Sequence, residues 1–127
     1  MLLGALMIFS CGGGEKNSSK IPLINGQQDM DKAMELSTTR LVMLDLYADW
    51  CGPCRMLSPT LEAIAEENKD RVSLYKVNVD NQPTIARQFN VSGIPLVVFI
   101  KNKQVVNSLT GLNPREAYLQ TILDYTR

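Results

Sequence analysis

The residues with the clearest chemical potential are two of the three cysteines, Cys51 and Cys54, which are separated by two residues. If they open a helix, their sulfurs lie one turn apart on the same face, where they can form a disulfide. A cysteine at a helix N-terminus favours the thiolate, because unpaired N–H groups and the helix dipole stabilise negative charge. Cys51 is therefore the predicted nucleophile, and Cys54 is predicted to resolve the mixed disulfide that Cys51 forms with a substrate.

Two other interpretations of this cysteine pair are weaker. A structural zinc site usually needs four Cys or His ligands, but the chain has no histidine and one other cysteine, Cys11. A purely structural disulfide would close too short a loop to constrain the unfolded chain. Because histidine is absent, Ser-His and Cys-His catalysis are also excluded. We expect no metal and no cofactor other than the redox-active disulfide itself.

Length and composition predict one small globular domain. A chain of 127 residues has room for a domain of about a hundred residues and a short leader. The 13 basic and 13 acidic residues balance, so no electrostatic field attracts nucleic acid. We expect a monomer that does not bind nucleic acid.

The elements that must position the cysteines alternate between strands and helices, which favours an α/β fold. Strands are predicted at residues 21–24, 41–48, 72–79, 95–100 and 105–109. Helices are predicted around residues 30–36, from Cys51, at 83–89, and from Asn113 with Asn113 as its cap and Pro114 in its first turn. The segment 41–48 is apolar on both faces, as in a central strand, so the cysteines lie at a strand-to-helix junction.

The segment from Asp45 to Arg55, which reads DLYADWCGPCR, resembles the active-site segment of thioredoxins, and the resemblance extends over about residues 21–127. It implies the thioredoxin fold, an α/β fold whose central mixed sheet is flanked by helices on both faces. It also implies dithiol–disulfide exchange with protein substrates. Gly52 and Pro53 are typical of thioredoxins proper, whereas dedicated oxidases and isomerases usually carry a histidine there, so the resemblance favours a reducing couple.

Asp45 is a carboxylate in a strand otherwise made for burial. Burying it without a partner costs several kcal/mol or raises its pKa, which indicates a use. The resemblance implies that Asp45 lies behind Cys54 and moves its proton, with Lys76 as the lysine nearby. The alternative is a charge at the end of the sheet that Lys76 simply satisfies.

The resemblance also implies a substrate-binding loop. X–Pro bonds are usually trans, but the Ile94-Pro95 bond, which follows Gly93, matches the family's cis proline that faces the sulfurs. The Ile94 backbone would then pair with an extended substrate segment. An apolar patch suited to flexible proteins would surround Cys51, formed by Trp50, Gly52, Pro53, Ile94, Pro95 and Gly111. The simpler alternatives are core packing for Trp50 and a plain turn at Gly111.

The N-terminal segment predicts export. Residues 2–9 are an apolar run, too short to cross a bilayer but suited to a signal, and Ser10 and Cys11 follow. This order resembles a bacterial lipoprotein signal, in which the cysteine receives a diacylglyceryl group. We therefore expect an export signal at 1–10, a lipid-bearing Cys11 with a flexible tether at 11–20, and the domain at 21–127. The alternative is a disordered apolar tail on a cytosolic protein.

The resulting hypothesis is an enzyme on the periplasmic side of a bacterial membrane that reduces or exchanges protein disulfides. A thioredoxin reductase or a membrane electron donor would recharge it. In an oxidising compartment the same couple could instead donate disulfides. The alternatives are a cytoplasmic thioredoxin recharged by a reductase, and a binding module that uses the groove at Ile94 and Pro95 with redox chemistry incidental.

Overall fold

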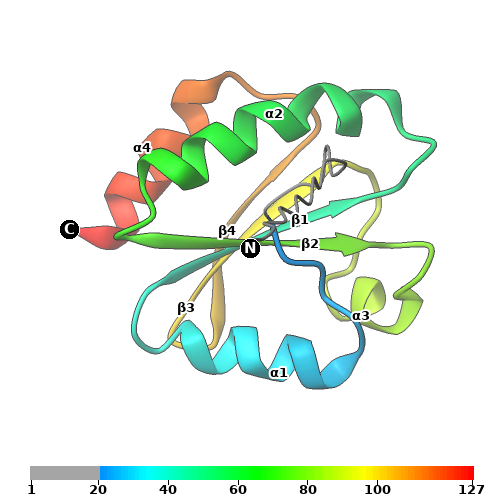
Figure 1. The fold of residues 1–127 in the computed structure, drawn as a ribbon, viewed down its shortest axis with the longest axis horizontal. Helices are drawn as coiled ribbons and strands as arrows, with labels where there is room; N and C mark the ends of the chain where they lie inside the picture. Colours follow the sequence, from blue (N-terminus) through cyan, green and yellow to red (C-terminus); the bar gives the residue numbers. More distant parts are fainter. Residues whose placement is uncertain (1–20) are drawn as a thin grey trace, which may run out of the picture.

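The computed structural model describes residues 21–127, which form a four-stranded sheet with helices on both faces (Figure 1). The strands, in the spatial order β2-β1-β3-β4, are β1 (Leu41–Tyr47), β2 (Val72–Asn78), β3 (Leu96–Lys101) and β4 (Gln104–Thr110). The helices are α1 (Gln27–Leu36), α2 (Gly52–Glu67), α3 (Pro83–Gln88) and α4 (Arg115–Thr126). The predicted α/β class, with a mixed sheet between helices, is confirmed.

Strand β1 lies in the interior of the sheet. It pairs with β2 in parallel and with β3 in antiparallel orientation, and all of its residues except Tyr47 are buried. Two parallel neighbours need a crossover connection, which α2 supplies between the end of β1 and the start of β2. The start of α2 therefore stands at the carboxyl end of a strand that is rigidly held on both sides.

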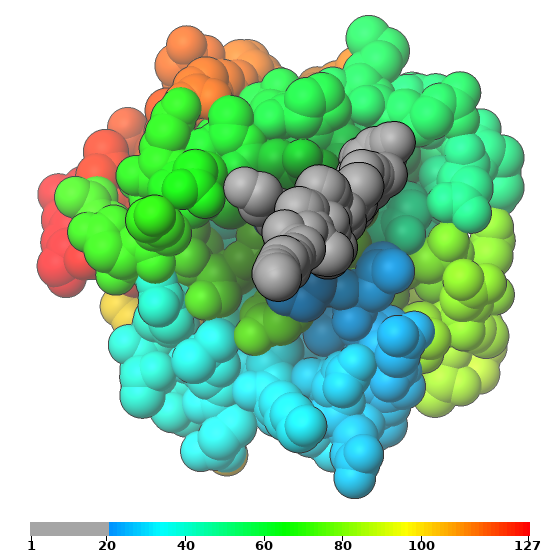
Figure 2. All heavy atoms as spheres, in the orientation of Figure 1, coloured from blue at the N-terminus to red at the C-terminus, as the bar shows by residue number. Residues whose placement is uncertain are grey.

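Alternation along β1 divides its side chains between two hydrophobic cores. Leu41 and Met43 pack in the core with α2 and α4, whereas Val42 and Leu44 pack in the core with α1 and α3. Figure 1 shows α2 and α4 above the sheet and α1 and α3 below it, and Figure 2 shows α2 in green and α1 in cyan on these two sides. By the same alternation, Asp45 faces α2.

The strands predicted at residues 95–100 and 105–109 correspond to β3 and β4, which pair as an antiparallel hairpin. Its turn consists of Asn102 and Lys103, which both have positive φ angles of 52° and 66°. Positive φ at both central residues is typical of the tight turns whose twist matches that of antiparallel strands.

The prediction of a first strand at residues 21–24 is wrong. Leu23 forms only an isolated bridge with Lys76 of β2, in which the Ile24 N–H donates to the Lys76 carbonyl and the Lys76 N–H donates to the Pro22 carbonyl. Pro22 has no N–H to donate, and the chain turns at Gly26, where φ is +88°. The ladder therefore ends after one bridge.

The prediction that Asn113 caps α4 is also wrong. Pro114 occupies the N-cap position, one residue before the first turn, and no side chain caps this helix. The Asn113 amide instead donates to the carbonyls of Thr110 and Gly111, at 3.1 Å and 3.3 Å. The Asn113 side chain, which the sequence pattern predicts to cap α4, therefore stabilises the turn before this helix instead.

Candidate active site

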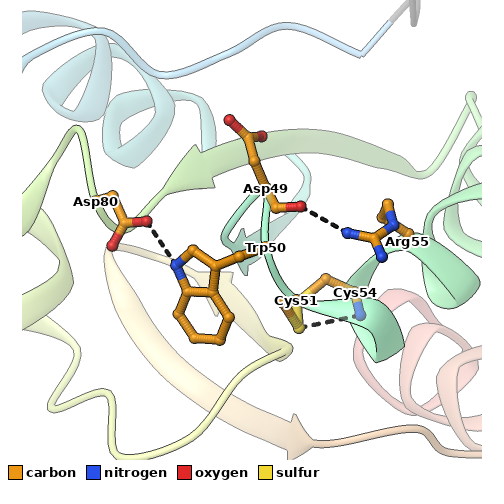
Figure 3. The surroundings of a disulfide bond; sticks show 6 residues. All are labelled: Asp49, Trp50, Cys51, Cys54, Arg55 and Asp80. Carbon is orange, nitrogen blue, oxygen red and sulfur yellow. Dashed lines mark hydrogen bonds between the residues drawn. A yellow bond between two sulfur atoms is a disulfide. The ribbon is translucent and has the colours of Figure 1, made fainter.

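Cys51 and Cys54 form a disulfide at the start of α2, with their Cα atoms 5.3 Å apart (Figure 3). Cys51 is the N-cap residue, and its Sγ accepts a hydrogen bond from the Cys54 N–H at 3.2 Å. Pro53 lies in the first turn, where its missing N–H has no helical partner to lose. The Arg55 guanidinium, directly after Cys54, donates to the Asp49 carbonyl at 2.7 Å. The predicted pairing at a helix N-terminus is confirmed.

The two cysteines are equally buried, with each residue 4% exposed, so exposure does not distinguish the predicted nucleophile from the predicted resolving residue. They differ in the hollow that each one borders. Cys51 lines a hollow of about 500 Å³ with Trp50 and Ile94, which we call the outer groove. Cys54 lines a separate hollow of about 300 Å³ with Lys76 and Ser58, which we call the lysine hollow.

The outer groove contains most of the residues predicted for substrate binding. Its predicted members are Trp50, Gly52, Pro53, Gly93 and Ile94. Sequence reasoning missed three further members, which are Val79, Val91 and Ser92. Val79 directly follows β2, and Val91 and Ser92 lie in the segment between α3 and β3, so only the folded chain brings them to the disulfide.

The Ile94-Pro95 peptide bond is cis, as the resemblance implies. Pro95 and Gly111 do not line this hollow, and their place in the substrate patch stays a prediction. The Gly111 N–H donates to the Pro95 carbonyl at 2.8 Å, and Gly111 has a φ of +79°. Gly111 therefore forms a turn that is tied to the proline loop.

Trp50 is 69% exposed, so the alternative of core packing is wrong. Its indole Nε1 donates to Asp80 Oδ2 at 2.8 Å, and Figure 3 shows the ring lying beside Cys51. Asn78 orients Asp80, because Asn78 Oδ1 accepts from the Asp80 N–H at 3.0 Å. Sequence reasoning missed Asp80. Asp80 lies just after β2, which is the parallel neighbour of β1. Because the carboxyl ends of parallel strands share one edge of the sheet, this position was the available signal that Asp80 lies near the site.

Asp45 is 3% exposed on the face of β1 that is covered by α2, and the strand register places it opposite Lys76. Burial raises the pKa of Asp45 from its ordinary value of 3.8 to about 6, with Lys76 opposing the rise and Glu62 adding to it. Within residues 21–127, no group donates to Asp45 Oδ1, and no ion pair joins Asp45 to Lys76. Lys76 therefore acts on the Asp45 charge without an ion pair, and the choice between a proton-transfer role and simple charge compensation stays a prediction.

Lys76 makes its contacts in the lysine hollow. Its Nζ donates to Ser58 Oγ at 3.2 Å and lies 4.5 Å from the centroid of the Tyr47 ring. Ser58 Oγ in turn donates to Glu62 Oε2, also at 3.2 Å. Sequence reasoning missed Ser58 and Glu62, because nothing in a helix pattern distinguishes them from ordinary polar positions.

Together, the fold and the site define a domain of the thioredoxin type. A disulfide caps the helix that follows the central strand, an apolar groove and a cis proline loop flank it, and a buried carboxyl lies beneath the same helix. The thioredoxin family profile matches residues 24–124. The chain belongs to the thioredoxin family.

Individual relatives agree with this assignment. The chain is 41% identical to thioredoxin-T of Drosophila melanogaster over 90 residues, covering 71% of this chain and 57% of that protein. It is 38% identical to a thioredoxin of Porphyra purpurea over 84 residues, covering 66% of this chain and 78% of that protein. It covers only 46% of a chloroplastic M-type thioredoxin of Spinacia oleracea, so it spans about half the length of some relatives.

Solved structures show the same fold. A thioredoxin of Fasciola hepatica matches with a TM-score of 0.77 and 32% identity, covering 83% of this chain and 99% of that one. A thioredoxin mutant of Halobacterium salinarum matches with a TM-score of 0.76 and 32% identity, covering 90% and 97%.

The predicted export signal, Cys11 and the tether lie outside the described residues. Within residues 21–127, no helix has the length and apolar character needed to span a bilayer. The same residues contain no cluster of three or more metal-binding side chains.

Proposed function

We propose that this chain reduces protein disulfides through Cys51 and Cys54. We also propose that it is exported and held at the periplasmic side of a bacterial membrane by a lipid on Cys11. The observation that carries the first proposal is the disulfide at the N-terminus of α2, with Cys51 on the edge of the outer groove.

The first step is attack on the substrate. In the reduced domain, the N-terminus of α2 stabilises the Cys51 thiolate, and the Cys54 N–H that donates to Cys51 Sγ is part of that stabilisation. The thiolate attacks one sulfur of a substrate disulfide. A bond forms between Cys51 and that sulfur, and the other substrate sulfur leaves as a thiolate.

The second step releases the substrate. Cys54 gives its proton to Asp45, and the Cys54 thiolate attacks Cys51 Sγ. The bond between Cys51 Sγ and the substrate sulfur breaks, and that sulfur leaves as a thiolate. The domain returns to the disulfide form, so two electrons pass from the domain to the substrate. Support for Asp45 comes from its burial beneath α2 and from its raised pKa of about 6, which lets it change protonation near neutral pH.

The test of this function is a stoichiometric exchange. The reduced protein is mixed with insulin, and the free thiols on each partner are counted by alkylation and mass spectrometry. We expect one insulin disulfide to be reduced for each Cys51–Cys54 disulfide formed. Insulin binding without any transfer of thiols would instead favour the non-catalytic binding module.

The electron donor is a thioredoxin reductase or a membrane donor. Support for the former comes from a relative in Mycobacterium leprae, 37% identical over 89 residues, whose name is bifunctional thioredoxin reductase/thioredoxin. The equilibrium reduction potential of the couple tests the direction. A potential near that of reducing thioredoxins, about −270 mV, supports a reductase, and one near −120 mV supports a disulfide donor.

Support for the membrane anchor comes from the order of the sequence, with an apolar run before Cys11 and a Gly- and Ser-rich tether after it. The full chain and its Cys11→Ser variant are expressed in a bacterium and separated into membrane and soluble fractions. We expect Cys11→Ser to leave the membrane fraction, and globomycin to block processing of the parent chain. Unchanged fractionation in both experiments would favour the cytoplasmic alternative.

A further inference from the structure

A chain of polar contacts fixes the Lys76 ammonium away from the buried carboxyl of Asp45. Lys76 Nζ donates to Ser58 Oγ, and Ser58 Oγ donates to Glu62 Oε2, each at 3.2 Å. Ser58 and Glu62 lie one turn apart on α2, which places both on one face of the helix. The Tyr47 ring, 4.5 Å from Nζ, holds the ammonium from β1. Two elements besides β2 thus determine where this charge lies.

The strand register alone would predict that Lys76 contacts Asp45 rather than Ser58. Asp45 and Lys76 are directly opposite in the register of β1 and β2, and opposite positions of neighbouring strands are close enough for side chains to interact. Nevertheless, no ion pair joins these two residues, and Asp45 Oδ1 receives no hydrogen bond from any group in the described part of the chain. The contact with Ser58 therefore holds Lys76 in one of two positions that it could occupy.

The position of Lys76 affects the acidity of Asp45. The groups that face Asp45 are Lys76 of β2, Glu62 of α2, Tyr47 of its own strand and Tyr118 of α4. Burial is the main reason that the Asp45 pKa is raised, Lys76 is the largest influence in the opposite direction, and Glu62 adds to the rise. A Lys76 ammonium in direct contact would stabilise the carboxylate and make it a weaker base.

We propose that Ser58 is a positioning residue for proton transfer, which holds the Lys76 ammonium between Glu62 and Tyr47 so that Asp45 remains able to accept the proton of Cys54. The inference rests on the proposed role of Asp45 in the second step of exchange. It assigns a function in the reaction to a side chain that lines the lysine hollow with Cys54 and does not line the outer groove.

The experiment follows the titration of the Asp45 carboxyl by carbon-13 NMR in the full chain, together with the pH dependence of insulin reduction. Ser58→Ala removes the hydroxyl that holds Lys76, and Ser58→Thr keeps a hydroxyl at this position. Thr60→Ala is the matched control, because Thr60 is a half-buried hydroxyl residue of α2 that is not the Lys76 partner.

We expect Ser58→Ala to move the Asp45 titration and the acid limb of the rate profile about one pH unit lower. Ser58→Thr and Thr60→Ala should retain the wild-type titration. If Ser58 acts through Lys76, Ser58→Ala should have no further effect on the titration in a Lys76→Met background. An unchanged titration in Ser58→Ala, or the same shift with and without Lys76, would overturn the positioning role.

The two proposals fail in different ways. If Asp45→Asn left the rate of exchange unchanged at every pH, the proposed role of Asp45 as proton acceptor would be wrong. If Asp45→Asn slowed exchange but Ser58→Ala moved neither the titration nor the rate profile, the role of Asp45 would stand and the role of Ser58 would be wrong.

Discussion

The two sides of the disulfide differ in chemistry. On the Cys51 side, the outer groove presents the exposed indole of Trp50 and the cis proline loop at Ile94. On the Cys54 side, the lysine hollow contains Lys76 and Ser58, with Asp45 buried beneath the same helix. A single disulfide bond thus separates a surface suited to contact with a protein from polar groups suited to proton transfer.

This difference makes a general prediction about variants. Changes in the outer groove should alter how tightly a protein substrate binds, without altering the pH dependence. Changes on the Cys54 side should alter the pH dependence, without altering binding. A variant that changed substrate binding and pH dependence equally would show that the two sides of the disulfide are not functionally separate.

The largest effect is expected at the boundary between the two sides. Cys51→Ser removes the sulfur that attacks the substrate, so insulin reduction should fall by at least about a thousandfold, the scale on which enzymes lose activity with their nucleophile. Far-ultraviolet circular dichroism checks that the fold is intact. A variant that retained a tenth of the wild-type rate would show that Cys51 is not the nucleophile.

Asp45→Asn tests the proton-transfer side. An amide cannot accept the proton of Cys54, so the rate at pH 7 should fall about a hundredfold. In the wild-type chain, Asp45 becomes protonated as the pH falls through about 6, so the rate should fall there. Stopped-flow measurements from pH 5 to pH 8 should show this fall in rate, the acid limb of the profile, in the wild-type chain and not in the variant. A limb that persisted in Asp45→Asn would assign it to another group.

The same substitution should stabilise the fold. Because the folded-state pKa of Asp45 is raised from 3.8 to about 6, its contribution to stability is fully present below pH 3.8 and is lost as the pH rises through about 6. At pH 7 the buried charge therefore costs about 3 kcal/mol. Urea unfolding of Asp45→Asn should show a gain of about this size at pH 7, and a smaller gain at pH 4. An equal gain at both pH values would contradict burial of a charge as its cause.

Trp50→Ala tests the outer groove and has the smallest expected effect. Loss of an exposed aromatic contact should raise KM for insulin about tenfold and leave the pH profile unchanged. Met56→Ala is the matched control, because Met56 is 67% exposed on α2 but does not line the groove. An equal change in KM for both variants would point to general surface hydrophobicity rather than to the groove.

Much of the site could be predicted because its residues break local patterns. Cys51 and Cys54 have a spacing with few chemical interpretations, and Asp45 is a charge inside an apolar strand. The prediction that the peptide bond before Pro95 is cis depended on the family resemblance, because X–Pro bonds are otherwise expected to be trans. These features are local in sequence, so no tertiary contact was needed to find them.

The errors arose where a tertiary contact decides between local options. The segment 21–24 has the composition of a strand, but Pro22 cannot donate and only one bridge forms. Asn113 has the propensity of a cap, but its amide bonds to the preceding turn. Asp80 and Ser58 resemble ordinary surface residues until folding places them against Trp50 and Lys76.

The central claim, that Cys51 attacks and Cys54 resolves, is tested most directly by trapping the mixed disulfide. Reduced Cys54→Ser and Cys51→Ser variants of the full chain are each incubated with insulin, quenched with acid and analysed by mass spectrometry. We expect a covalent adduct of insulin on Cys51 in Cys54→Ser, and little adduct in Cys51→Ser. An adduct that accumulated on Cys54 instead would contradict the assignment of the two cysteines to the two sides of the site.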